Sequence, residues 1–504
     1  MNAAVKKKQS LPSRGIPRKV CHERHWDCVT TTTTTPPKKG MRVFCAIHGT
    51  IELGDCAAHV AQSPAFYRLD GVRQLGGCSY VYPSATHTRR EHSLGVAHLS
   101  RKAGVCLQRL YPDLVSATDV ARLELAGLVH DLGHGPFSHT FEACFATFSH
   151  EQEGVRLLHA LALDRTFSDV AARCLGDGWL DAVRNMVLGL APDPSRAFLF
   201  QIVHAHHSGI DTDKLDYLER DCHAVMGTTN MLSVDRIVEG MRIVVSEDGA
   251  RTLGFDERVE AEVCNVYRIR TMMHRQVYQH RSVLLVESLL VSMLHRVDAA
   301  RTDAGQLSLC RQLAQGVDGL VDGSLLLHPG ARAHEVMAWK QWQRLPTTLR
   351  VRTLPSCAHC GHETQIPDRH CAQCGHDLCN RAFISDAVGV RNVVGANVTS
   401  GDATRAVQAR CGVAVCVVVS DIRGGAHLLR YDAWGRPWND WGWEPIPIVS
   451  EAAPHGCLTS PAHMRWREAV CYAPPGTAPA DVARAQTAFE TWGAPALPNR
   501  PPKK

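Results

Sequence analysis

The chain has 504 residues, of which 45% are hydrophobic and 21% are charged, a balance typical of a soluble globular protein with its own core. No apolar run approaches the roughly 18 residues that a membrane helix needs, which excludes a membrane-spanning role. The net charge of +5 is compatible with a polyanionic substrate or partner, although many proteins with neither carry as much.

The 20 cysteines predict a reducing compartment, because they are scattered and only one group of them has regular spacing. No apolar signal-peptide core follows the N-terminus. We therefore expect an intracellular protein of the cytosol or nucleus. The basic N-terminal segment also leaves a mitochondrial location open.

Composition divides the chain into segments. The start carries KKK and then TTTTTTPPKKG, which cannot build a core. We expect a mainly α protein whose helical core carries a zinc-ribbon insertion and a small α+β C-terminal lobe. The expected division is a disordered basic tail at 1–40, the helical core at 41–345, the zinc ribbon at 346–382, the α+β lobe at 383–490 and a disordered tail at 491–504.

Hydrophobic periodicity predicts the elements of the core. Helices are expected at 91–110, 117–134, 150–163, 211–226, 256–300 and 305–317. Thr118 or Asp119 is the predicted N-cap of the second of these helices. The stretch 240–254 alternates apolar and polar residues around Asp248-Gly249, which predicts a hairpin.

The stretch LVHDLGHGPFSH concentrates metal-binding groups behind the apolar run LELAGLV. His130 and Asp131 are adjacent at the predicted helix end, and His134 lies one turn further on the face of His130. Gly133 and Gly135 are expected to let the backbone bend tightly, which would bring the following histidine back toward the same pocket. Imidazole and carboxylate groups suit a divalent metal that activates water.

Two distant helices carry matching stripes of functional side chains. Asp213, Tyr217 and Asp221 follow one another at i, i+4 and i+8, so they share one helix face, and Lys214 lies beside it. The helix after residue 256 carries the second stripe.

In this second stripe Arg270, His274 and Tyr278 have the same spacing, and such a face can clamp a polyphosphate and stack on a sugar or base. Each stripe taken alone is more often a solvated face. Together with His92 and the His130-Asp131 pair, the stripes predict a metal centre with a basic wall.

A second metal site is predicted from two cysteine pairs, Cys357 with Cys360 and Cys371 with Cys374, each followed by Gly-His. Paired knuckles of this kind resemble a zinc ribbon, and four thiolates satisfy tetrahedral zinc. A structural clip is the favoured role. Contact with nucleic acid or a protein partner is the alternative.

A series of stretches between about 48 and 281 follows the order of one known family: HGTIEL, QLGG, TRREHSLGVAHL, LAGLVHDLGHGPFSHTFE, SHEQEG, GIDTDKLDYLERDCH and MMHRQVYQH. On these stretches the chain resembles the HD-domain phosphohydrolases. It is most similar to the deoxynucleoside triphosphate (dNTP) triphosphohydrolases related to the sterile-alpha-motif and HD domain-containing enzyme. The HD doublet alone is a weak signal, whereas HDLGHGPFSH combined with DxDKxDYxxRD is highly specific. The short basic tail stands where the sterile-alpha-motif domain would be expected.

The resemblance implies a role for each candidate residue within an HD-domain catalytic core at 41–345. His92, His130, Asp131 and Asp213 would hold the metal. His134, His139 and His150 would line the phosphate side, with Glu142 beside them at a position that is usually Asp, and His150 would be the acid/base residue. Arg89, Lys214, Tyr217 and Arg270 would bind phosphates, with His274 in the same stripe, while Gln74 and Asp221 would hold the 3′-hydroxyl and Leu75 and Tyr278 would crowd the 2′ position.

The implied reaction is metal-dependent hydrolysis of a dNTP to a deoxynucleoside and inorganic triphosphate, by attack of metal-activated water on the α-phosphorus. Iron, manganese, magnesium and zinc all tolerate the mixed nitrogen and oxygen ligand set. A homo-oligomer, a dimer or tetramer, is expected from the family. Two alternatives stay open: an HD phosphohydrolase of another nucleotide, and a regulatory protein that binds nucleic acid through the ribbon.

One departure concerns regulation. In the nucleotide-activated members an allosteric pocket includes the segment that matches VAQSPAFYRLD. Asp70 stands there in place of a cation and should repel a triphosphate. We hypothesise that activation at that site is lost or altered. Strong dependence of dATP hydrolysis on added dGTP would contradict this.

Overall fold

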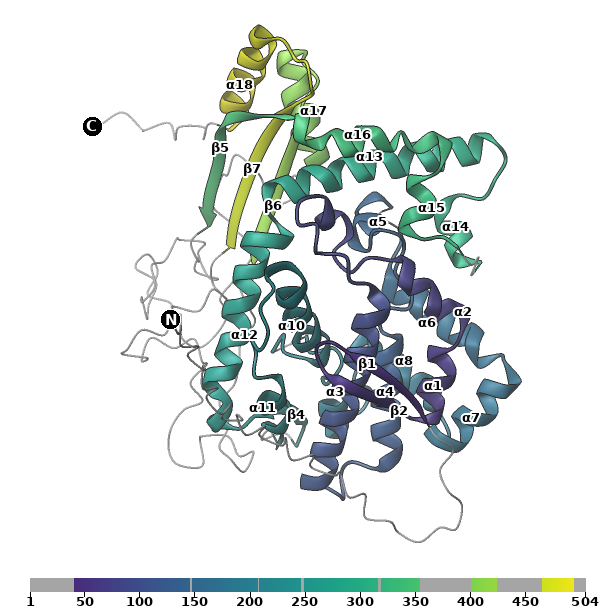
Figure 1. Ribbon diagram of the computed structural model, residues 1–504. Coiled ribbons are helices and arrows are strands. Elements are labelled where there is room, and N and C mark those ends of the chain that lie inside the picture. Colours follow the sequence, from purple (N-terminus) through teal and green to yellow (C-terminus); the bar gives the residue numbers. More distant parts are fainter. Residues whose placement is uncertain are drawn as a thin grey trace, which may run out of the picture. The chain divides into compact units, whose positions relative to one another are not determined.

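The computed structural model describes residues 40–145, 147–206, 208–245, 249–315, 319–353, 400–423 and 465–493 (Figure 1). The four ribbon cysteines and nearly all of the two predicted tails lie outside these residues, so what was expected of them stays a prediction. The described chain is mainly helical with small antiparallel sheets, which confirms the predicted fold class.

Helices carry most of the described chain. Up to residue 226 they are α1 (Asp55–Ala61), α2 (Pro64–Tyr67), α3 (Arg89–Leu110), α4 (Ala117–Val129), α5 (His139–Cys144), α6 (His150–Ala162), α7 (Arg165–Leu175), α8 (Trp179–Leu188), α9 (Ala197–Phe200) and α10 (Thr212–Met226). They continue with α11 (Val234–Glu239), α12 (Glu260–Met273), α13 (Arg281–Asp303), α14 (Leu309–Ala314), α15 (Asp322–Leu326), α16 (Ala333–Met337), α17 (Ser400–Cys411) and α18 (Pro479–Gly493). Short 3₁₀ turns include η2 (Gly76–Tyr80), and one π-helical turn, η5, spans His274–Tyr278.

Two predicted helix features are wrong in detail. The expected single helix over 256–300 is divided into α12 and α13, because His280 has an extended backbone and its side chain caps α13 by accepting from the Ser282 N–H. No proline or glycine marks this break, so the apolar pattern runs through it unchanged. The N-cap of α4 is Ser116, which forms a reciprocal capping box with Asp119.

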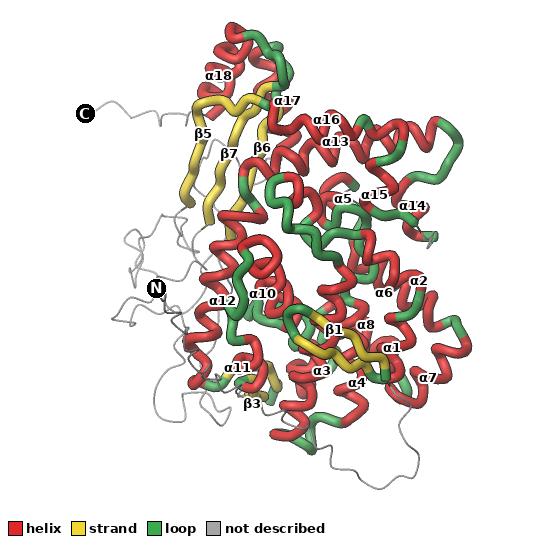
Figure 2. The backbone as a smooth tube through the Cα atoms, viewed as in Figure 1, coloured by secondary structure: helices red, strands yellow, loops and turns green. Residues whose placement is uncertain are grey.

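Strands of the described residues form three small sheets (Figure 2). The predicted hairpin is present as β3 (Met241–Val245) paired with β4 (Arg251–Phe255). A hairpin of β1 (Met41–Cys45) and β2 (Gly49–Leu53) was not predicted. The third sheet has the order β5-β7-β6, with β5 (Gln343–Thr353), β6 (Cys416–Arg423) and β7 (Arg465–Ala473). Its first strand runs across the predicted division at 345/346, and α17 and α18 cover its buried face around Val407 and Phe489.

Close packing of α3 against α4 and α10 positions the histidine-aspartate cluster. A Cβ at Gly127 of α4 would lie 2.8 Å from the Val96 carbonyl oxygen of α3, so only glycine lets the two helices approach this closely. A Cβ at Gly95 of α3 would overlap the Asp216 carboxylate of α10. These two glycines therefore allow three helices to meet at one point.

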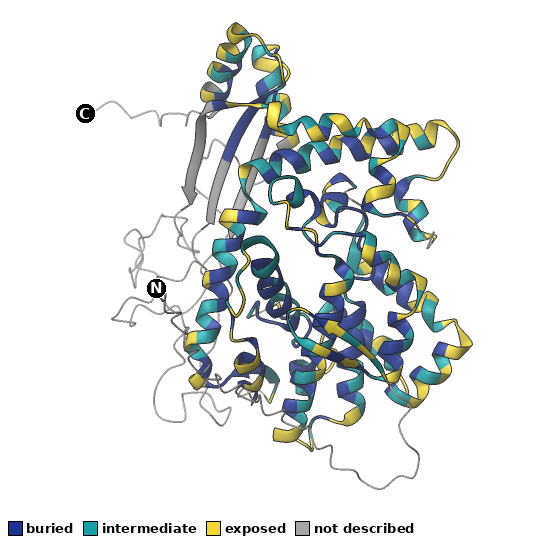
Figure 3. Ribbon diagram, viewed as in Figure 1, coloured by how far each residue is buried: buried dark blue, intermediate teal, exposed yellow. Residues whose placement is uncertain are grey.

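The core surrounds these helices. In α4, Leu123, Leu125 and Leu128 are fully buried, and α4 packs against α1, α3, α7 and α8 (Figure 3). A helix apolar on nearly all sides belongs inside a protein, which explains the run LELAGLV. In the described ranges, no helix combines the length and hydrophobicity that a membrane span requires.

Candidate metal centre and nucleotide pocket

Three helices supply the predicted metal ligands. His92 comes from the first turn of α3, His130 follows the last turn of α4, and Asp213 lies in the first turn of α10. The two Nε2 atoms of His92 and His130 are 3.2 Å apart. Asp213 Oδ1 is 3.1 Å from His92 Nε2 and 3.6 Å from His130 Nε2. Asp131 Oδ2 lies 3.5 Å from His92 Nε2.

These donors fit one divalent metal ion. The Nδ1–H of His130 donates to the Gly127 carbonyl oxygen at 2.8 Å, and the Nδ1–H of His92 donates to Asp216 Oδ2 at 2.7 Å. Both Nε2 atoms therefore point into the same space, where each could give a lone pair to a shared cation in place of holding a proton. Donors about 2.1 Å from one ion lie roughly 3.0–3.4 Å apart, close to the distances between these groups.

Charge within the centre favours ionised carboxylates. Burial opposes ionisation of Asp131, yet the Arg89 guanidinium, 2.6 Å away, helps to hold its pKa well below the usual range. Burial is likewise outweighed at Asp213, where hydrogen bonds from His130 and His92 lower the pKa. Burial also opposes protonation of His92, but hydrogen bonds with Asp213 and Asp216 raise its pKa to about 9. The centre is thus built to hold positive charge.

Asp216 supports the centre from behind and was missed in the sequence. It is fully buried and accepts from His48 Nε2 at 2.6 Å, from His92 Nδ1 at 2.7 Å and from both Nε and a terminal nitrogen of Arg220. Its place three residues after Asp213, in the same DxDKxDY stretch, was a signal that could have identified it. A carboxylate in this position orients a metal-binding imidazole.

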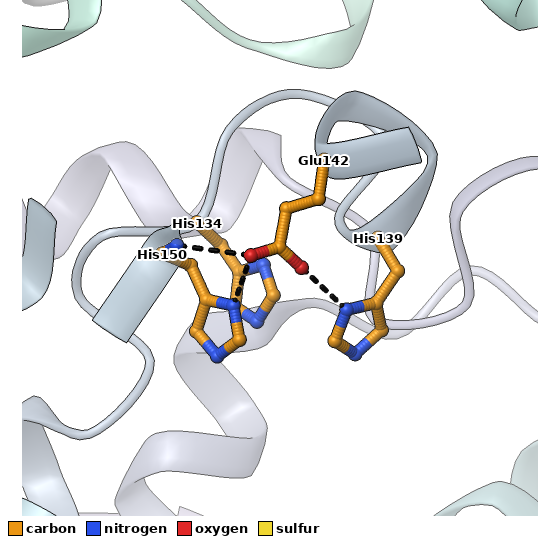
Figure 4. Close-up of side chains that lie close together, drawn as sticks. All are labelled: His134, His139, Glu142 and His150. Atoms are coloured by element: carbon orange, nitrogen blue, oxygen red, sulfur yellow. Dashed lines mark hydrogen bonds and ion pairs between the residues drawn. The ribbon is translucent and has the colours of Figure 1, made fainter. Parts of the chain in front are cut away.

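A second cluster gathers His134, His139, Glu142 and His150, whose donor atoms all lie within 4.8 Å of one another. Figure 4 shows the two carboxylate oxygens of Glu142 directed to different histidines. Oε1 accepts from His150 Nδ1 at 2.6 Å, and Oε2 accepts from His139 Nδ1 at 2.8 Å. Partial burial opposes ionisation of Glu142, but these hydrogen bonds hold its pKa well below the usual range.

The rings of His134 and His150 stack with centroids 3.9 Å apart. His134 is fully buried, and burial together with the nearby Arg89 holds its pKa well below the usual value, so its ring is neutral. A Cβ at Gly133 would overlap the His150 carbonyl oxygen. Glycine at this position therefore lets the loop approach the start of α6 closely enough for the two rings to meet.

The loop between α4 and α5 changes direction at other residues than we predicted. Gly133 and Gly135 do not adopt positive φ, whereas Phe137 and Ser138 do, at 60° and 54°. Hydrogen bonds hold this unfavourable backbone: the Phe137 N–H donates to Asp322, and Ser138 Oγ accepts from Arg89 Nε. Gly135 is required for space, because a Cβ there would lie 2.6 Å from the Phe141 ring.

A cavity of about 410 Å³ joins the two clusters. Its lining includes the nine residues predicted for substrate binding: Gln74, Leu75, Arg89, Lys214, Tyr217, Asp221, Arg270, His274 and Tyr278. The cavity is also lined by His130, Asp131, Asp213, His134, His139 and His150; His92 contacts His130, and Glu142 contacts His150. The structure thus brings together all the candidate residues outside the ribbon, although their individual roles stay predictions.

Polar atoms of the wall suit an anionic ligand. Near Lys214 burial is outweighed by Asp211 and Asp213, which raise the pKa of the ammonium group, so Lys214 is charged. Burial raises the pKa of Tyr217 to about 12, which keeps its hydroxyl protonated. Arg270 Nε and His274 Nδ1 are buried and have no hydrogen-bond partner within the described ranges. The Nε–H of Arg270 is a charged donor and favours a ligand rich in oxygen atoms.

His87 is a further residue that sequence reasoning missed. Its Nε2 lies 2.7 Å from Asp221 Oδ1, and the Tyr278 hydroxyl donates to Asp221 Oδ2 at 2.6 Å. The side chain of Asp221 is 1% exposed. Because its two oxygens have different partners, its carboxylate is held from both sides. The sequence placed Asp221 and Tyr278 on separate stripes and contained no sign that they would touch.

Residues 89–221, which include all four predicted metal ligands at the ends of α3, α4 and α10, match the HD domain family, so the chain contains an HD domain. The chain is also similar to the human "Deoxynucleoside triphosphate triphosphohydrolase SAMHD1", with 31% identity over 275 residues that cover 50% of this chain and 44% of the relative. The frog (Xenopus laevis) protein of the same name is 31% identical over 316 residues, which cover 56% of this chain and 49% of that protein.

A viral protein is similar as well. The "Putative HD domain-containing protein L394" of Acanthamoeba polyphaga mimivirus is 30% identical over 269 residues, which cover 50% of this chain and 57% of its own. The chain spans about half the length of the curated relatives it matches.

Proposed function

We propose that this protein is a metal-dependent dNTP triphosphohydrolase that releases a deoxynucleoside and inorganic triphosphate. The observation that carries the proposal is the cavity itself, because metal donors, cationic groups and the histidine His150 line one space. The similarity to proteins named as deoxynucleoside triphosphate triphosphohydrolases supports the choice of substrate. Assembly as a dimer or tetramer stays a prediction.

The cationic wall would bind the triphosphate. Arg89, Lys214 and Arg270 come from three different helices and converge on the cavity. Charges fixed in this way stabilise the negative charge that develops on phosphate oxygens without reorganising during the reaction. Because Arg89 also pairs with Asp131, it would link the phosphates to the metal centre.

His150 would act as the proton donor to the leaving 5′-oxygen. Glu142 accepts from its Nδ1, which leaves Nε2 available to the substrate. A carboxylate in this position orients the imidazole and stabilises its protonated form. His134, stacked on His150 and neutral, would hold the ring in place and keep water from its face.

His92, His130, Asp131 and Asp213 would hold the divalent metal, whose chemistry when bound is to lower the pKa of water so that hydroxide forms near neutral pH. Two nitrogen and two oxygen donors suit iron, manganese, magnesium or zinc. The metal's identity is therefore left to measurement.

The sugar would lie against α10 and the segment before η2. Gln74 and Asp221 would bind the 3′-hydroxyl, and Asp221 is held ready by His87 and Tyr278. Leu75 would crowd the 2′ position and so reject ribonucleotides. Unlike a polar wall, an apolar side chain offers a 2′-hydroxyl no hydrogen bond.

The test is to incubate the purified protein with each dNTP and rNTP in the presence of Mn²⁺ or Mg²⁺ and to measure inorganic triphosphate. We expect triphosphate from dNTPs only. Asp213→Ala should abolish release, whereas Asp235→Ala should leave it unchanged, because Asp235 is exposed and pairs only with Lys102 among the described residues. Release of orthophosphate or pyrophosphate instead of triphosphate would support the alternative of another HD phosphohydrolase. If none of these three products were released, the alternative of a regulatory protein would be supported.

A further inference from the structure

The carboxyl group of Glu287 lines the cavity but has no role in the proposed chemistry. Glu287 lies in α13, one turn after Val283, and both side chains line the cavity. The α13 helix packs against η2, where a Cβ at Gly77 would lie 3.7 Å from Glu287 Cγ. Glu287 is therefore placed on the wall that follows Gln74 and Leu75.

Glu287 has no hydrogen-bond or ion-pair partner within the described ranges. Burial alone raises the pKa of its carboxyl group to about 7. A half-buried carboxyl group without a protein partner takes its hydrogen bonds from water or from a ligand that supplies donors. The cavity is the space from which such donors would come.

The position of Glu287 along the cavity can be related to the two ends of the α10 stripe. Asp213 and Asp221 are separated by eight residues of α10, or about 12 Å along the helix axis. Cys78, at the Asp221 end, has its pKa raised to about 12 by burial and by the charges of Glu287 and Asp221. Glu287 thus lies toward the Asp221 end of the cavity, the end away from Asp213.

We infer that Glu287 recognises the nucleobase and favours guanine over thymine; this inference rests on the proposed function. A carboxylate offers two acceptor oxygens, and guanine presents N1–H and the 2-amino N–H side by side, so both oxygens are satisfied. Thymine presents a single N–H between two carbonyl oxygens, which a carboxylate repels. Adenine and cytosine present one amino group beside a ring acceptor, so the preference for these two bases should lie between those for guanine and thymine.

The experiment compares kcat/KM for dGTP, dITP and dTTP in the wild type and in Glu287→Gln. At about pH 8 a carboxyl group of pKa about 7 is ionised. We expect the wild type to prefer dGTP over dTTP by roughly tenfold or more, and dGTP over dITP, which lacks the 2-amino group, by a smaller factor. Glu287→Gln should reduce both preferences to about twofold or less.

Glu151→Gln is the matched control, because Glu151 also lines the cavity but lies in α6, next to His150. This variant should keep both preferences. The glutamine variant conserves size, and its melting temperature reports whether it folds. The dITP comparison in the wild type needs no variant and keeps the inference testable. Equal use of dGTP, dITP and dTTP by an active wild type, or preferences unchanged in Glu287→Gln, would overturn the inference alone. Failure to hydrolyse any dNTP would overturn the proposed function as well.

Discussion

Asp216→Asn should weaken metal binding although Asp216 does not face the metal. The carboxylate accepts four hydrogen bonds, from His48, His92 and twice from Arg220. An asparagine of the same size has one acceptor oxygen and an amide that only donates. Where the amide donates to His92 Nδ1, the proton of that ring moves to Nε2, the atom that would bind the metal.

Two magnitudes follow from this change. Loss of a carboxylate behind a metal-binding histidine lowers metal affinity by about 10- to 100-fold. Arg220 is nearly fully buried and would lose its ion pair, which costs about 3 kcal/mol of the free energy of unfolding. Metal titration calorimetry with Mn²⁺ measures the first, and urea unfolding measures the second.

The matched control is Asp256→Asn. Asp256 is 2% exposed and pairs with Arg242 and Arg258, but it lies outside the metal centre. The Asp256→Asn variant should be less stable than the wild type but should keep the metal affinity of the wild type within about twofold. If Asp216→Asn bound Mn²⁺ as tightly as the wild type, the orienting role of Asp216 would be refuted.

Three further predictions concern other parts of the molecule. Leu75→Ala should raise the ratio of rNTP to dNTP kcat/KM by about tenfold, and an unchanged ratio would show that Leu75 does not crowd the 2′ position. Gly133→Ala should lower the free energy of unfolding in urea by about 1–3 kcal/mol, because the added Cβ overlaps the His150 carbonyl oxygen; a loss below about 0.5 kcal/mol would contradict the packing argument. Hydrogen bonds from Arg258 lower the pKa of Asp256 to about 2, so its carboxylate stabilises the fold above the unfolded value of 3.8. About 1–2 kcal/mol of the free energy of unfolding, allowing for the exposure of Arg258, should be lost as the pH falls from about 4 to 2. Asp256→Asn should lack this loss, and parallel curves of unfolding free energy against pH for the two proteins would contradict the prediction.

The sequence alone determined the helical class and the candidate residues. Helical spacing is a local property, so the stripes Asp213-Tyr217-Asp221 and Arg270-His274-Tyr278 could be read without a structure. Both line the cavity, even though His274–Tyr278 forms a π-helical turn rather than a continuous α-helix. The hairpin at β3 and β4 was likewise predictable, since its alternation of side chains and its turn are both local.

Only the tertiary structure decided how these pieces meet. His92 and His130 converge because Gly127 lets α3 and α4 touch, and no pattern within either helix contains that contact. Asp216 and Glu287 look like ordinary charged residues in the sequence. What distinguishes them is the presence of partners around the first and their absence around the second among the described residues. Burial and partnership depend on residues far along the chain, so they arise only when helices from remote segments pack together.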